Sequence, residues 1–137
     1  LDSRSPLAAQ ANRFRGGGVE SASRYEVERV EYCSVRNVHF VKKVALELGG
    51  TAAGQRPQGR GNAMGRRRAK HAIASRKWLN LQSDLLRASY TLADCLARGQ
   101  SVLLHCSDGW DRTPQMATLA QLILDPYYRT IEGLVVL

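Results

Sequence analysis

A cysteine and an arginine six positions apart carry the strongest chemical signal in the sequence. Cys106 and Arg112 belong to the stretch His-Cys-Ser-Asp-Gly-Trp-Asp-Arg-Thr at residues 105–113. An arginine offers a planar fork that binds two phosphate oxygens at once. A positive field also stabilises a thiolate, so the pKa of the Cys106 thiol should be lowered and its sulfur nucleophilic near neutral pH. The pair suits transfer of a phosphoryl group to cysteine.

The flanking sequence predicts the elements that position these two side chains. The apolar run Val102–Leu104 follows Gly99 and is typical of a short buried strand. From about Thr113 apolar residues recur with helical spacing, and this helix should end before Asp125-Pro126. A loop between a strand and a helix N-terminus turns backbone N–H groups toward an anion. A buried structural cysteine beside an unrelated surface arginine is the alternative, and it leaves this arrangement unexplained.

Composition sets the broad class of the protein. The 137 residues suffice for one domain with a core, and no apolar run approaches the roughly 18 residues of a membrane span. The N-terminus does not resemble a signal peptide, and the missing initiator methionine suggests a piece of a longer chain. Three scattered cysteines do not make a disulfide framework, and thiolate chemistry needs reducing surroundings, so a cytoplasmic location is expected. Cys33 and His39 lack further ligands, so no metal site is predicted.

The net charge of +8 is concentrated in one segment. Eight basic residues and no acidic residue lie between Leu48 and Ser83, whereas the other twelve basic residues are balanced by twelve acidic ones. Glycines and prolines interrupt residues 44–77, whose composition predicts a disordered or weakly ordered segment. Its basic block could bind anionic lipid or lie in solvent, and the lack of interleaved aromatic residues disfavours nucleic acid as a partner.

The rest of the chain gives weaker structural signals. Residues 1–24 are predicted to be loop-like, and the glycines at 16–18 fit either a flexible linker or a turn at a site. A strand is expected at about Arg29–Ser34, with a new element after Arg36. A helix is expected from about Ser83, which can cap it, to Ala97.

The nine residues of the loop resemble the active-site loop of the myotubularin family of phosphoinositide 3-phosphatases, which are cysteine phosphatases. Further similar stretches are Asp2-Ser3-Arg4, Ala11-Asn12-Arg13, Gly16-Gly17-Gly18-Val19-Glu20, Asn37-Val38-His39, Trp78-Leu79-Asn80-Leu81 and residues 127–133. The resemblance covers about residues 1–43 and 78–137, whereas residues 44–77 diverge. It implies an incomplete α/β phosphatase domain over residues 1–137. This domain would have a protein-tyrosine-phosphatase-like fold, with the phosphate-binding loop between a strand and a helix. Pro114 replaces a small residue usual in the family, and proline is tolerated in a first helical turn.

The resemblance also implies roles for individual residues. Cys106 would be the nucleophile, Arg112 the phosphate ligand and Asp111 the general acid. His105 would hold the loop, and Trp110 would either pack under the headgroup or wedge the loop. Independently of the resemblance, the aspartates outside the loop (Asp2, Asp84, Asp94 and Asp125) have no reason to face the site. The residues expected to contact substrate are Asn12, Asn37, Val38, Ser107, Asp108, Gly109, Trp110, Asp111 and Arg112, and Asp108 would orient the inositol hydroxyls.

The implied reaction removes the 3-phosphate of phosphatidylinositol 3-phosphate or 3,5-bisphosphate through a phosphocysteine, with no metal or cofactor. The implied partners are the lipid headgroup, the surface of endosomal-type membranes, and family members in homo- or hetero-oligomers. A catalytically silent interaction module is one alternative, which the retention of Cys106, Asp111 and Arg112 together disfavours. A protein-tyrosine phosphatase is another, disfavoured by two aspartates inside the loop. The isolated chain is expected to be poorly folded and inactive.

Overall fold

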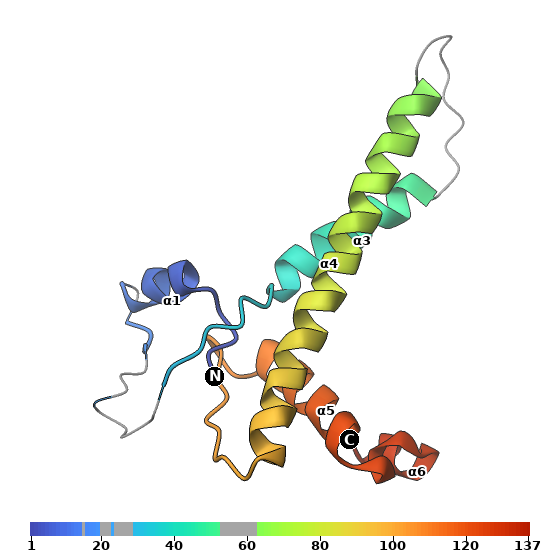
Figure 1. The fold of residues 1–137 in the computed structure, drawn as a ribbon. Coiled ribbons are helices and arrows are strands. Elements are labelled where there is room, and N and C mark those ends of the chain that lie inside the picture. Colours follow the sequence, from blue (N-terminus) through green and yellow to red (C-terminus); the bar gives the residue numbers. More distant parts are fainter. Residues whose placement is uncertain (15, 20–22, 24–28, 53–62) are drawn as a thin grey trace. The chain divides into compact units, whose positions relative to one another are not determined.

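The computed structural model describes residues 1–14, 16–19, 23, 29–52 and 63–137 as two separate units (Figure 1). The first unit comprises Leu1–Arg36 and Asp84–Leu137, and the second comprises Asn37–Ser83. The described helices are α1 (Pro6–Arg13), α3 (Val38–Ala52), α4 (Ala63–Ala97), α5 (Arg112–Leu124), the 3₁₀ helix η1 (Pro126–Arg129) and α6 (Ile131–Val136). The boundary between the units falls within α4, so this helix contributes residues to both. Among the described residues, no helix combines the length and apolar character needed to cross a membrane.

Three short backbone segments pair side by side in the first unit. Asp2 forms parallel bridges with Tyr32 and with His105, so the first segment, residues 1–4, lies between the other two. The Cys33 N–H donates to the Asp2 carbonyl at 2.8 Å, and further backbone hydrogen bonds join the first segment to His105. Residues about 30 and 100 positions from the first segment are thereby fixed against it.

This pairing corrects the expectation of an α/β fold. Within the described part of the chain the bridges stay isolated, no strand forms, and the regular structure is helical. The strands predicted at Val102–Leu104 and Arg29–Ser34 are each replaced by one bridged residue, at His105 and at Tyr32. The segments are too short for a longer ladder of hydrogen bonds, because the first segment ends after four residues at Ser5, the cap of α1.

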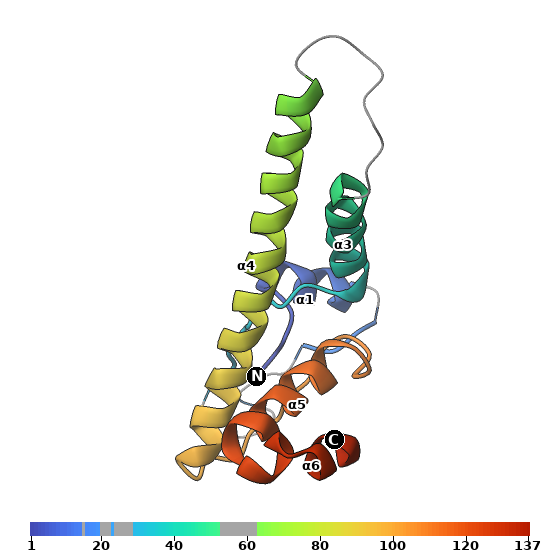
Figure 2. The same cartoon turned by 90° about the vertical axis from the view of Figure 1, so that its right-hand side faces the viewer.

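The core of the first unit lies between the end of α4 and α5, which run next to each other (Figure 2). Ala88 of α4 packs with Met116 of α5, and farther along Leu92 and Ala93 pack with Ala120. Leu104, just before the loop, contacts both clusters. The first consists of Val35, Ala88 and Met116, and the second of Leu92, Ala93 and Ala120. The predicted helix after the loop is confirmed, including its end before Asp125.

Residues 6–13 form a helix where the sequence predicts a loop. The Ser5 hydroxyl caps this helix by accepting a hydrogen bond from the Ala8 N–H at 3.2 Å, and Pro6 occupies its first turn. Serine followed by proline is a strong start signal, and the alanines after it are good helix formers. The Ser5-Pro6 pair therefore begins α1, which places Asn12 in its last turn.

Helix α4 begins 20 residues before the predicted start at Ser83, which is an interior position. No proline or glycine occurs between residues 66 and 98, and alanine, arginine, lysine and leucine there favour a helix. The segment 44–77, expected to be weakly ordered, is helical over residues 44–52 in α3 and 63–77 in α4. Residues 53–62 of that segment lie outside the described residues. At about 1.5 Å per residue, the 35 residues of α4 extend roughly 52 Å.

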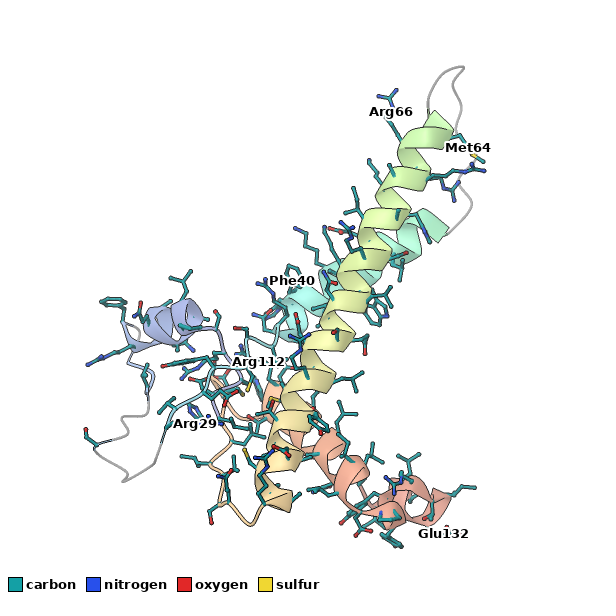
Figure 3. All side chains as sticks on the ribbon, viewed as in Figure 1. Arg29, Phe40, Met64, Arg66, Arg112 and Glu132 are labelled. Atoms are coloured by element: carbon teal, nitrogen blue, oxygen red, sulfur yellow. The ribbon has the colours of Figure 1, made fainter. Side chains whose placement is uncertain are left out.

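The second unit is a pair of helices that carries the positive charge of the chain. Val44 of α3 and Ala74 of α4 are buried, and the Lys77 ammonium contacts the Glu47 carboxylate at 2.9 Å. The hydrogen bond from Lys77 lowers the pKa of Glu47 from its ordinary value. Residues 37–83 contain ten basic residues and one acidic residue, so this unit holds a net charge of +9. Arg66 and Met64 extend from the N-terminal end of α4 (Figure 3).

The end of α4 generates a prediction about stability. Gly99 has a φ of +76°, and the N–H groups of Gly99 and Gln100 close the helix by donating to Leu96 and Cys95. Gly99→Ala should lower the free energy of unfolding by about 1 kcal/mol, because a side chain disfavours positive φ. Urea denaturation of the full-length protein measures this loss.

Gly49→Ala is the matched control for Gly99→Ala. Gly49 lies inside α3, its φ is not positive, and an added Cβ would meet nothing within 4 Å. Alanine should therefore stabilise the protein at this position by about 0.5–1 kcal/mol. Equal effects of the two substitutions would contradict the proposed role of Gly99 at the helix end.

Candidate active site

The loop between His105 and α5 is held at both of its ends. On one side the His105 N–H donates to the Leu1 carbonyl at 3.1 Å, and the Ser3 N–H donates to the His105 carbonyl at 2.9 Å. On the other side Arg112 is the first residue of α5, so the loop ends at a helix N-terminus. Gly109, in between, has a φ of +82°, a conformation that favours glycine. Cys106 lies inside this turn and is 7% exposed.

The surroundings of Cys106 favour its thiolate. Burial alone raises the pKa of the thiol, but hydrogen bonds from the Thr113 hydroxyl and from the backbone N–H groups of Thr113, Gly109 and Asp108 outweigh burial. The resulting pKa is about 7, against an ordinary value of 9.0. The Gly109 N–H donates to Cys106 Sγ at 3.1 Å. At pH 7 about half of the sulfur is therefore ionised and able to attack.

Thr113 presents its hydroxyl to this sulfur. Oγ1 of Thr113 is buried and has no regular hydrogen-bond partner among the described residues, yet it lies close enough to Cys106 to lower the pKa of the thiol. The absence of a competing acceptor leaves the hydroxyl hydrogen available to the thiolate. An ionised sulfur draws this hydroxyl closer than a neutral thiol does, so the hydrogen bond forms with the thiolate.

Ser107 joins two residues that the sequence predicts at the site. The Asn12 amide donates to the Ser107 hydroxyl oxygen at 2.7 Å, and the Arg112 guanidinium donates to the same oxygen at 2.9 Å. Asn12 comes from the last turn of α1. Arg112 comes from the start of α5 (Figure 3). The Nε of Arg112 is buried and has no hydrogen-bond partner among the described residues. The arginine fork therefore keeps an unused donor inside the loop.

The aspartates and the tryptophan of the loop have different surroundings. The Asp111 carboxylate accepts a hydrogen bond from the Gln115 amide at 2.7 Å, one turn later in α5. Asp108 is exposed, and Trp110 is 82% exposed. A ring so exposed does not wedge the loop from inside, which leaves packing against a bound headgroup as the alternative.

Asn37 and Val38 belong to the second unit. The Asn37 carboxamide oxygen accepts a hydrogen bond from the Phe40 N–H at 3.1 Å, at the start of α3. Val38 is the first residue of that helix and is exposed. The structure describes the two units separately, so a role of these two residues in substrate binding stays a prediction.

Two residues that the sequence did not predict at the site adjoin the loop. Asp2 and Arg4 are each 1% exposed, and they form an ion pair of 2.8 Å between Asp2 Oδ2 and Arg4 Nη2. The Asp2 carboxylate lies 3.9 Å from His105 Nε2, a proximity to the loop that the sequence analysis did not anticipate. The only available signal was the Asp-x-Arg spacing in the stretch that resembles the family.

The glycines at 16–18 form a packed turn. The Gly17 N–H donates to the Asn12 carbonyl at 2.9 Å, and an added Cβ at Gly17 would lie 3.0 Å from that oxygen. The Gly18 carbonyl accepts a hydrogen bond from Arg4 Nη2 at 2.9 Å. The glycines could have formed a flexible linker or a turn at the site, and the structure supports the turn.

Cys33 shows what the same unit does to a thiol without hydrogen-bond donors. Burial raises the pKa of the Cys33 thiol to about 11. Its sulfur packs against the buried cluster of Val35, Ala88 and Met116. The contrast with the value of about 7 at Cys106 comes from the donors of the loop, so Cys106 is the more readily ionised of these two thiols.

Sequence comparison finds similar proteins in several organisms. Human phosphatidylinositol-3,5-bisphosphate 3-phosphatase MTMR4 is 42% identical over 138 residues, which cover 100% of this chain and 11% of that protein. Human phosphatidylinositol-3,5-bisphosphate 3-phosphatase MTMR6 is 35% identical over 141 residues, covering 100% and 21%. Phosphatidylinositol-3-phosphatase myotubularin-2 of Arabidopsis thaliana is 34% identical over 150 residues, covering 97% and 18%. The chain thus spans about a tenth to a fifth of the length of these relatives.

No solved structure matches the chain significantly. The family model described as myotubularin-like phosphatase domain, however, matches residues 1–137. That match covers the loop, the paired segments before it and both units. The chain therefore belongs to the myotubularin-like phosphatase family.

Proposed function

We propose that this chain forms part of a phosphoinositide 3-phosphatase that works through a phosphocysteine at Cys106. The observation that carries the proposal is the lowered pKa of the Cys106 thiol, about 7, in a loop that ends at the N-terminus of α5. Anions bind favourably at such a terminus, where backbone N–H groups point outward. A nucleophile and an anion site therefore share one loop.

The first chemical step is attack of the Cys106 thiolate on the phosphorus of the substrate. A sulfur–phosphorus bond forms, the bond between phosphorus and the inositol oxygen breaks, and this oxygen takes a proton from Asp111. In the second step water attacks the phosphocysteine and gives its proton back to Asp111. Inorganic phosphate leaves, and the sulfur–phosphorus bond breaks to restore the thiolate. Neither step needs a metal or a cofactor.

Arg112 is suited to hold the phosphoryl group through both steps. One of its nitrogens, Nη2, contacts Ser107, and its Nε has no partner among the described residues. A phosphate has enough acceptor oxygens to bind both nitrogens at once. The charge of Arg112 also offsets the repulsion between the phosphate and the carboxylates of Asp108 and Asp111.

Asp111 is the better placed of the two loop carboxylates to act as the acid. Its side chain is tied to Gln115 and directly precedes Arg112, which holds the phosphate in this proposal. Asp108 lies in the exposed part of the turn, where it suits contact with inositol hydroxyls. A general acid must reach the leaving oxygen at hydrogen-bond distance, so the fixed side chain is favoured.

The names of the relatives support the proposed substrate class. Those compared above carry names that specify phosphatidylinositol 3,5-bisphosphate or phosphatidylinositol 3-phosphate phosphatases, and both lipids share the 3-phosphate. Such a substrate lies at a membrane surface, which suits the exposed ring of Trp110. We accordingly propose a cytoplasmic enzyme that acts peripherally on endosomal-type membranes, alone or in oligomers with family members.

The decisive experiment measures phosphate release by the full-length protein from a panel of soluble phosphoinositides and a phosphotyrosine peptide. Release from phosphatidylinositol 3-phosphate and 3,5-bisphosphate, with little from lipids lacking a 3-phosphate, is expected. Preference for the phosphotyrosine peptide would indicate a protein phosphatase. No release from any member would indicate a silent interaction module.

Cys106→Ser tests the nucleophile. A serine hydroxyl at this position stays protonated near neutral pH, so turnover of phosphatidylinositol 3-phosphate should fall by more than about tenfold while binding stays measurable. Cys95→Ser is the control, because Cys95 lies on α4 outside the loop, and it should keep near-normal turnover. Activity of Cys106→Ser within tenfold of the unaltered protein would contradict the phosphocysteine.

Asp111→Asn tests the acid. Loss of the proton donor should lower kcat strongly for a phosphoinositide, whose alcohol leaves poorly, and far less for p-nitrophenyl phosphate, whose leaving group needs no proton. The amide keeps the size of the side chain and its contact with Gln115, so folding should not change. Asp108→Asn is the matched variant. Equal losses on both substrates for Asp111→Asn would assign the acid role to Asp108.

A further inference from the structure

We propose that Asp2 and Arg4 are positioning residues, and that their buried pair fixes the Cys106 loop and gives the thiolate a buried, positively charged neighbour. The inference deepens the proposed function, because it concerns the same nucleophile. It concerns two residues of the first segment, which lies outside the loop and makes the backbone bridges beside it.

The pair is fixed by several hydrogen bonds at once. Arg4 Nε donates to Asp2 Oδ1 at 2.9 Å, and Arg4 Nη2 donates to Asp2 Oδ2 at 2.8 Å. The backbone N–H of Arg4 also donates to Asp2 Oδ1 at 2.9 Å. The side chains are therefore locked to each other and to their own backbone. A two-point contact of this kind needs a guanidinium and a carboxylate, and a lysine would form only part of it.

The pair also connects the parts of the structure that surround Cys106. Arg4 Nη2 reaches the Gly18 carbonyl at 2.9 Å and so holds the glycine turn after α1. Asp2 bridges to His105, the residue directly before Cys106, and its carboxylate lies 3.9 Å from His105 Nε2. Movement of either side chain would therefore disturb the turn beside Asn12 and the start of the loop together.

Arg4 and the Cys106 thiolate attract each other. The hydrogen bond with Asp2 is the main cause of a raised pKa at Arg4, and the charge of Cys106 raises that pKa further. Attraction between two charges is mutual, so Arg4 favours the thiolate in turn. Both side chains are buried, and solvent screens their interaction less than it screens a surface pair.

Other ionisable groups near the loop must be kept constant for a test of this attraction. They come from the segments paired beside residues 1–4 and from the loop, and they are Glu31, Tyr32 and Cys33 in the segment around Tyr32, and His105, Asp108, Asp111 and Arg112 in the loop and at the start of α5. Substitution of Asp2 or Arg4 alone leaves all the others in place.

The two members of the pair should act on Cys106 in opposite directions. Arg4→Met removes the positive neighbour and leaves Asp2 negative, so the pH midpoint of thiol ionisation should rise by about 0.5–1 unit. Asp2→Asn keeps an oxygen that accepts from Arg4 but removes the negative charge, so the midpoint should fall. A purely structural role would loosen the fold in both variants without moving the midpoint in opposite directions.

The test measures the alkylation rate of Cys106 by iodoacetamide against pH in the full-length protein, with the Cys106 peptide followed by mass spectrometry. This readout needs no turnover, so it separates the inference from the proposed function. Opposite shifts without phosphate release would uphold the pair and contradict the phosphatase. Phosphate release with unshifted midpoints would support the phosphatase and contradict the proposed role of the Asp2–Arg4 pair.

Further variants keep the test decisive if Arg4→Met does not fold. Arg4→Lys keeps the charge, so the midpoint should stay near that of the unaltered protein while the melting temperature falls. Arg98→Met and Asp94→Asn are controls, because they break an exposed ion pair of 2.9 Å on α4, and neither should move the midpoint. A midpoint that stays the same or rises in Asp2→Asn would overturn the proposal.

Discussion

The structure of the site depends on the parallel pairing of the first segment with the segments around Tyr32 and His105. This pairing brings residues far apart in the sequence to the base of one loop. It buries Asp2 and Arg4, whose charges would be costly inside a protein unless they were matched. The start of the loop then has a fixed backbone, and α5 fixes its end. The pKa of Cys106 follows, because the N–H groups that lower it are held in place.

The chemistry of the loop could be predicted from the sequence because its determinants are local. The spacing of Cys106 and Arg112 and the helical pattern after Thr113 are enough to place the cysteine in a loop that ends at a helix N-terminus, and α5 begins as expected. Asn12 could be assigned only from the resemblance to the family. Its contact with Ser107 joins residues 95 positions apart, and no local pattern encodes such a contact.

The errors of the sequence-based predictions have physical causes as well. The Ser5-Pro6 pair is a helix start signal that also occurs in turns, and the hydrogen bond from the Ala8 N–H to the Ser5 hydroxyl identifies it here as a helix start. Asp2 has no neighbour in sequence that marks it as buried, because its burial comes from pairing with distant backbone. The glycines near residue 50 suggested weak order, although α3 continues to Ala52 and Val44 of α3 and Ala74 of α4 are buried.

The ionisation of Cys106 has a consequence for its redox chemistry. A thiolate reacts with peroxide much faster than a thiol does, and the first product is a sulfenic acid that a cellular thiol can reduce again. Cys33, whose pKa is about 11, is a thiol at the same pH and is spared. Peroxide would therefore oxidise Cys106 before Cys33, and in the proposed enzyme the recovery of activity would follow the local supply of reductant.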